Sequence, residues 1–144
     1  MTMTGSALTE KAQNVNWLLE QFVDQTAGVE QAVGVSADGL LMAMFTPLDR
    51  GEADKLAATI SALTTLGQSA TRMLNKGAFS QVIVDFQGGY LLVSSINARA
   101  AIGVVTGAGC DLGLIGYETT LLVERVGELL TPELITELKT SLLL

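Results

Sequence analysis

Residues 81–105 read QVIVDFQGGYLLVSSINARAAIGVV, three apolar runs separated by turn residues. The runs 81–86, 90–96 and 101–105 have the length of strands and are rich in Val, Ile and Leu. Gln87-Gly88-Gly89 between the first two runs predicts a hairpin, and therefore antiparallel pairing. These residues place a sheet at the centre of the fold.

A second hairpin is predicted before these three apolar runs. Ala37-Asp38-Gly39 separates a β-branched run around Val33 and Val35 from the apolar run Leu40–Phe45. The five runs together predict a single five-stranded antiparallel sheet.

Segments with helical periodicity flank the strands. The first starts at Leu8 and ends at Thr26-Ala27-Gly28, and the second is expected over Glu52–Leu74 after a loop at 46–51. Asp111 is a candidate N-cap for a third helix that runs to about Leu130, and Thr131-Pro132 begins a fourth. The order α-β-β-α-β-β-β-α plus a C-terminal helix predicts an α+β sandwich with helices on both faces of the sheet.

The 144 residues are the length of one domain. We expect a lead-in at 1–7, the domain itself at 8–130 and a C-terminal helical extension at 131–144. We find no internal repeat and no linker.

Composition excludes several classes of function. Eight basic against fifteen acidic residues give a net charge of −7, which argues against a nucleic-acid partner and against an anionic membrane surface. No stretch of about 20 apolar residues predicts a membrane span, and the N-terminus lacks the features of a signal peptide. There is no histidine, and Cys110 is the single cysteine, so imidazole chemistry and an internal disulfide are excluded and a cytoplasmic location is expected.

No motif for chemistry stands out. Gly107-Ala108-Gly109 precedes a helix, but the Gly-Lys-Ser/Thr of a phosphate loop is missing, and Asp111 places a carboxylate where a phosphate would lie. Cys110 has no basic residue close in sequence and is interpreted as a small packed side chain. We therefore predict no catalytic residue, no cofactor and no metal site.

The second helix is unusual because Leu56–Thr71, LAATISALTTLGQSAT, contains no charged residue. One apolar stripe suffices for a helix that packs on a sheet, yet a second strip runs beside it through Ala62, Leu66 and Met73. Burial of this helix within one chain is one interpretation, and a subunit interface is the favoured one. The helical residues assigned to that interface are Leu56, Thr59, Ala62, Leu63, Leu66, Ala70 and Met73.

Trp17 lies on the polar side of the first helix, about 160–200° from its apolar stripe at ~100° per residue. Two interpretations stay open. The C-terminal helix covers the indole, or Trp17 is a binding anchor for a partner.

The stretch Gly28–Leu40, GVEQAVGVSADGL, resembles the opening hairpin of roadblock / light-chain-7 domains. Ala53–Ala58 is similar to the Ala-rich second helix of that family, and Leu112–Ile115 to the start of its last helix. The resemblance spans about residues 10–130. Ala27 stands where the family often has Pro, and the segment 131–144 lies beyond the minimal domain.

The resemblance implies a profilin-like fold and a non-catalytic regulator that dimerises through the second helix and the adjacent third strand. It thereby adds Val82 and Val84 to the expected interface. It also implies a Ras-like small GTPase as partner in a bacterial signalling system.

A dimer of that kind places polar segments near its symmetry axis. Asp49, Arg50 and Lys76 in those segments are candidates for partner binding together with Trp17, although solubilising loop charges explain them equally well.

Alternatives of other classes are a small-molecule sensor, an interaction scaffold without a GTPase and, last, an enzyme. The sensor would need convergent polar groups, for which the sequence offers Tyr90, Asp85, Ser94 and Ser95.

Overall fold

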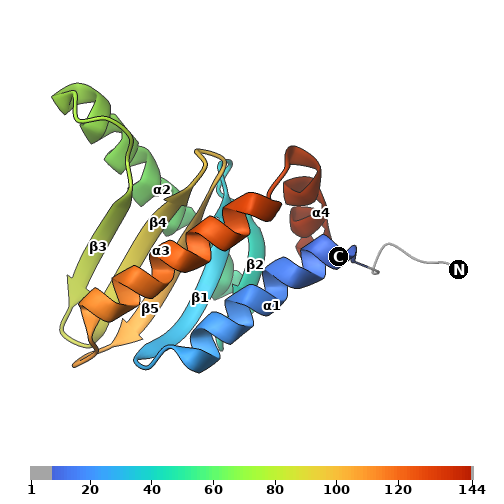
Figure 1. Cartoon of the computed structure of the whole chain (residues 1–144), viewed down its shortest axis with the longest axis horizontal. Coiled ribbons are helices and arrows are strands. Elements are labelled where there is room, and N and C mark those ends of the chain that lie inside the picture. The colour runs from blue at the N-terminus through green and yellow to red at the C-terminus, as the bar shows by residue number, and fades with distance from the viewer. Residues whose placement is uncertain (1–7, 144) are drawn as a thin grey trace, which may run out of the picture.

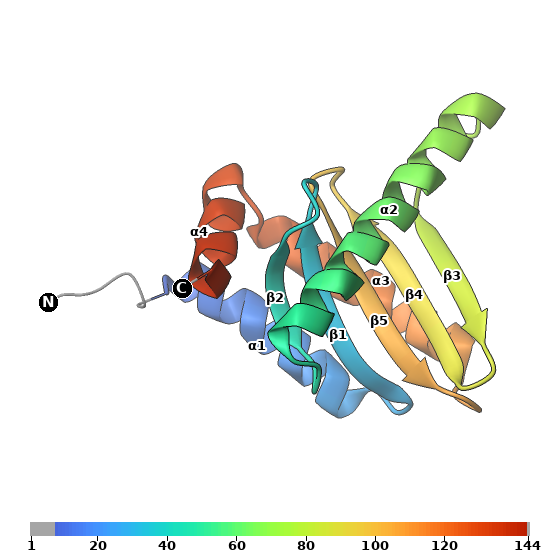
Figure 2. The ribbon, with the colours of Figure 1, turned by 180° about the vertical axis from the view of Figure 1, so that it is seen from behind.

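The computed structural model describes residues 8–143. Its elements, in chain order, are α1 (Glu10–Gln25), β1 (Val29–Ser36), β2 (Leu41–Phe45), α2 (Arg50–Leu74), β3 (Gln81–Phe86), β4 (Gly89–Ile96), β5 (Ala100–Gly107), α3 (Leu112–Leu129) and α4 (Pro132–Leu143). The five strands form one antiparallel sheet in the order β2-β1-β5-β4-β3. Helices α1 and α3 cover one face and α2 crosses the other (Figures 1 and 2), which confirms the predicted α+β sandwich.

The predicted turns contain glycines in backbone conformations that other residues rarely adopt. Gly39 takes φ +83° at the turn between β1 and β2, and Gly89 takes φ +147° at the start of β4. A Cβ at Gly89 would lie 1.9 Å from the carbonyl oxygen of Thr106, so only glycine fits there. The caps predicted at Asp111 and Thr131 are also confirmed, because their side chains accept hydrogen bonds from the N–H groups of Leu114 and Leu134 at 3.1 Å.

Two predicted helix starts need correction. Helix α2 begins at Arg50 and not at Glu52, because the Asp49 carboxylate caps it by accepting from the Glu52 N–H at 2.8 Å. Helix α1 begins at Glu10 and not at Leu8, with Thr9 as its cap. In both places the residue whose side chain caps the helix sets the boundary.

The sheet separates two apolar cores. On one face, side chains such as Leu19, Ile102 and Ile115 pack beneath α1, α3 and α4. On the other, Ile60 of α2 lies over Gly103 of β5, where a Cβ would come within 2.2 Å of the Ile60 Cδ1. The missing side chain at Gly103 is what lets α2 approach the sheet so closely.

Helix α4 lies beside β2, at one edge of the sheet (Figures 1 and 2). Leu138 belongs to the α1–α3 core, whereas Leu142 packs against the α2 core, so the helix contacts both layers.

Polar contacts hold α4 in place. The Glu137 carboxylate accepts from the backbone N–H and hydroxyl of Thr9 at 2.8 and 2.9 Å, and the Lys139 ammonium donates to Asp38 at 3.0 Å. The Leu142 carbonyl accepts from the Arg50 guanidinium. Strand β3, at the opposite edge, has β4 as its one strand partner in the described residues.

Candidate interaction surface on α2 and β3

Helix α2 carries large exposed apolar side chains in its C-terminal half. The exposed fraction is 67% for Leu66, 77% for Met73 and 63% for Leu74. The C-terminal turns of α2 project past the ends of the neighbouring strands (Figure 2). Large apolar side chains on a helix end without support from the sheet indicate a surface that another protein covers.

The free edge strand β3 continues this surface. Val82 and Val84 point toward α2 and pack at the margin of its core, and both remain partly exposed. Phe86 lies on the same side of β3 as Val82 and Val84, because side chains alternate along a strand, and it is 52% exposed. Asp85 also lies on this edge strand and is exposed.

The predicted interface residues on α2 divide into two groups. Leu56 and Leu63 pack against the core of their own chain. The others lie toward solvent: Thr59, Ala62, Leu66 and Met73 are exposed, and Ala70 is half-buried. The second apolar strip of the sequence is therefore an outer surface in the structure.

Leu74 and Phe86 belong to the same exposed region and were not predicted as interface residues. The alternation of Val82, Val84 and Phe86 could have identified Phe86.

The charged candidates lie at the two ends of α2. Asp49 caps the helix, and Arg50 forms an ion pair with Asp54 at 3.0 Å as well as its bond to α4. Lys76 follows the other end and is exposed. About 36 Å separate the two ends at 1.5 Å per residue, so one chain does not bring these charges together.

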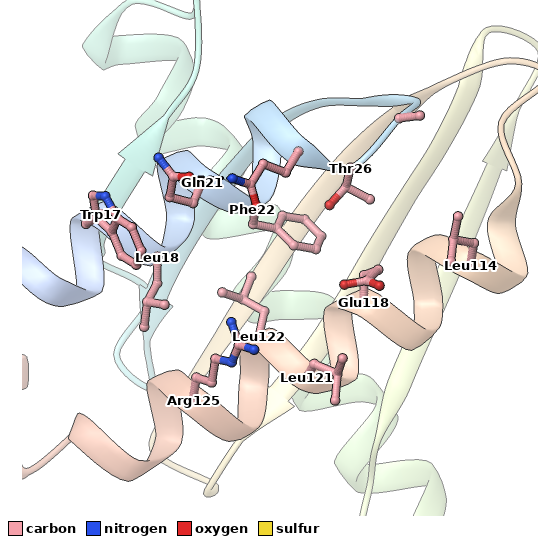
Figure 3. A pocket seen from close by; sticks show the side chains of 12 residues that line it. Trp17, Leu18, Gln21, Phe22, Thr26, Leu114, Glu118, Leu121, Leu122 and Arg125 are labelled. Carbon is pink, nitrogen blue, oxygen red and sulfur yellow. Dashed lines mark hydrogen bonds between the residues drawn. The ribbon is translucent and has the colours of Figure 1, made fainter.

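Trp17 lies on the other side of the sheet. It is 56% exposed, so α4 does not cover it. Its indole lines one end of a groove of about 560 Å³ between α1 and α3 (Figure 3). The interpretation that the C-terminal helix covers the indole is therefore wrong, and the role of Trp17 as a binding anchor stays a prediction.

The polar residues considered for a ligand sensor do not all converge: Asp85 and Tyr90 are direct partners in the β3–β4 register, whereas Ser94 lies four residues further along β4. Ser94 lies on the α1–α3 side of β4, and Ser95 on the opposite side, because successive side chains of a strand alternate. Asp85 is exposed at the sheet edge.

Catalytic and metal-binding groups are equally sparse. Within residues 8–143 no cluster of three or more acidic, His or Cys side chains could hold a metal ion. The thiol of Cys110 packs beside the α1–α3 core, 3.5 Å from the Thr106 hydroxyl. The Ser36 hydroxyl, and then the Lys139 ammonium, hold the pKa of the Asp38 carboxyl below its ordinary value.

The family follows from comparison with known proteins. The model of the Roadblock/LC7 domain matches residues 15–106, and the chain belongs to that family. It is a family of non-catalytic regulatory and adaptor domains. No helix in the described part of the chain is long and apolar enough to cross a membrane.

Solved structures agree with this assignment. A Roadblock/LC7 domain from Streptomyces avermitilis is 34% identical, covers 77% of this chain and 92% of its own, and superimposes with a TM-score of 0.72. The gliding protein MglB from Thermus thermophilus is 16% identical over 85% of this chain and 93% of its own, with a TM-score of 0.75. A profilin from Schizosaccharomyces pombe shares the fold at 11% identity, 77% and 94% coverage and a TM-score of 0.59. No curated protein sequence matches the chain.

Proposed function

We propose that this chain is a homodimeric, non-catalytic regulator that binds a Ras-like small GTPase in a signalling system. The observation that carries the proposal is the exposed apolar surface formed by α2 and β3. Such a surface is costly in a monomer and is stable when a second copy covers it. Membership of a family of regulatory and adaptor domains supports the same function.

The proposed dimer pairs two α2 helices and joins the sheets near their β3 edges. The face of α2 over residues 56–71 has small side chains and no charge, so two helices can approach closely without desolvating an ion. Helix α4 occupies the β2 edge, which leaves β3 as the edge available for pairing. A two-fold axis at β3 uses the same surface on both copies and closes after two.

Antiparallel pairing of the two helices would also bring their charged ends together. The Asp49–Arg50 end of one copy would then lie near Lys76 of the other, at the rim of the apolar contact. Rim charges mainly govern association rate and specificity. The GTPase would dock on this composite surface, which neither copy possesses alone.

The GTPase part of the proposal is supported by the structural similarity to MglB, a gliding protein. The sequence has no phosphate loop, so a nucleotide cycle that the chain regulates would belong to another protein.

The test has two stages. Light scattering should first give a mass near twice 15.1 kDa at micromolar concentration. Ras-like GTPases from the source cell, purified and loaded with GDP or a non-hydrolysable GTP analogue, should then be titrated against the dimer. Binding that depends on the nucleotide supports the proposal, and binding of no such GTPase in either state refutes it.

Two variants locate the contact. Arg50→Glu should slow association with the GTPase while the dimer remains intact. Trp17→Ala, on the opposite side of the sheet, should leave association unchanged. If Trp17→Ala abolishes binding and Arg50→Glu does not, the GTPase docks on α1 and the composite-surface model is wrong.

A further inference from the structure

The two edge strands of the sheet differ in charge. Strand β3 reads QVIVDF and carries the exposed Asp85, a charge that disfavours pairing with unrelated strands. Strand β2 has no such charge, because residues 40–45 read LLMAMF, six apolar residues without Pro or Gly. An uncharged apolar strand at a sheet edge is a typical starting point for strand pairing between molecules, so β2 needs another form of protection.

Helix α4 lies beside this edge and covers most of β2 (Figure 2). Residues 41–43 are each 2% exposed although they belong to an edge strand. Leu138 of α4 belongs to the same core as Met42, and Leu142 packs against the core that contains Leu41. Because α4 contributes to the cores on both faces of the sheet, it closes the outer side of the first three residues of β2.

The uncovered part of β2 is short. Met44 and Phe45, its last two residues, are each 36% exposed. Two residues are fewer than the roughly three to ten of an ordinary strand. The pairing of β2 with β1 also skips Met42, which forms a β-bulge, another feature that is frequent at protected edges.

Polar contacts fasten α4 to the elements that surround β2. The Glu137 carboxylate accepts at 2.8 and 2.9 Å from Thr9, the cap of α1. The Lys139 ammonium donates at 3.0 Å to Asp38, in the turn that leads into β2. Arg50, the first residue of α2, donates to a carbonyl in the last turn of α4. Release of α4 therefore requires that its contacts with three separate parts of the chain break together.

We propose that α4 closes the β2 edge against strand pairing with a second copy of this chain. In residues 8–143 this leaves β3 as the one open strand edge. A protein with one open edge stops at two copies, whereas a protein with two open edges adds copies at both ends without closure. The closure requires neither the α2–β3 dimer nor the GTPase. Without α4 at the edge, a monomer would pair through β2 alone, and a dimer would extend into a longer chain.

Thr136→Pro tests the proposal in the full-length chain. Thr136 is exposed in the interior of α4, where proline removes an intrahelical hydrogen bond and collides with the preceding turn. Thr136→Ala keeps the helix and is the matched control. In sedimentation velocity, the weight-average mass of Thr136→Pro should rise with protein concentration to at least about twice that of Thr136→Ala. Hydrogen exchange over residues 132–143 verifies that α4 is released, and circular dichroism verifies that the rest is folded.

A second variant releases α4 without proline. Glu137→Ala/Lys139→Ala removes two of the side chains that anchor α4, leaves its apolar residues in place and keeps the net charge. Its mass should rise in the same direction as that of Thr136→Pro, by a smaller factor. Glu10→Ala/Lys11→Ala, at two exposed positions of α1, is the charge-neutral control and should sediment like the wild type.

A charge on β2 identifies the edge that pairs. In either released variant, adding Met44→Lys should return the mass to the control value, because pairing at β2 would bring like charges together. In the wild type the same substitution should leave the mass unchanged, since α4 already closes the edge. A released α4 without any increase in mass would overturn the proposal. So would larger assemblies that persist after Met44→Lys, because they would arise from a surface other than β2.

Discussion

Leu66→Ala tests the proposed dimer at its most exposed leucine on α2. Truncation removes three carbons, worth ~2.4 kcal/mol if the whole side chain becomes buried at ~0.8 kcal/mol per methylene. Because 67% of Leu66 is exposed in the single chain, about two thirds of that, ~1.6 kcal/mol, is gained at the interface. Two copies contribute in a symmetric dimer, so the loss of ~3 kcal/mol raises the dissociation constant on the order of 100-fold.

The assay is sedimentation velocity over a concentration series that spans the wild-type dissociation constant. Leu and Ala have similar helix propensities, so the thermal unfolding of the monomer should change little. Tyr117→Ala is the matched control, because it removes a 61% exposed side chain from the opposite face of the sheet. A wild type that is monomeric at micromolar concentration, or equal dissociation constants for Leu66→Ala and Tyr117→Ala, would refute the proposed dimer interface.

Three further predictions concern stability and nucleotide binding. Gly103→Val should lower the free energy of unfolding by about 3 kcal/mol, because the new Cβ would lie 2.2 Å from the Ile60 side chain. Urea unfolding measures this free energy. A loss below about 1 kcal/mol would contradict the close packing of α2 on β5. Asp38→Asn should cost under ~1 kcal/mol at pH 7, since the Asp38 carboxylate that pairs with Lys139 is more than half exposed to solvent. The pKa of Asp38 is lowered in the folded chain, so its contribution is complete above the unfolded pKa of about 4 and is lost as pH falls through the lower folded pKa. Wild type and variant should converge there in urea unfolding, and a difference that grows on acidification would refute the assignment. Calorimetry with GTP should give no binding to the chain alone, because the sequence has no Gly-Lys-Ser/Thr phosphate loop and places the Asp111 carboxylate just after the Gly107–Gly109 turn. A micromolar affinity for GTP would contradict this prediction.

Local features of this protein follow from its sequence. The hairpins are predictable because Gly39 and Gly89 occupy backbone conformations that other residues rarely adopt. The caps at Asp111 and Thr131 are predictable because the bonds they accept span three residues. The absence of charge over 56–71 indicates an unusual helix before any neighbour is known. The cap at Asp49 was missed because the apolar pattern starts later than the hydrogen bonding does.

Long-range packing decided the strand order, the free edge of the sheet and the groove between α1 and α3. The strand order β2-β1-β5-β4-β3 places α4 at one edge and leaves β3 open, and no local pattern distinguishes those two edges. The α1–α3 groove is lined by Trp17 and Leu122, residues more than 100 positions apart, so its shape depends on how two helices lie on one sheet. The sequence by itself determined which residues form helices, strands and turns, because sterics and hydrogen bonds act over a few residues. Only the tertiary structure decided which apolar side chains stay exposed, because burial depends on every element that packs nearby.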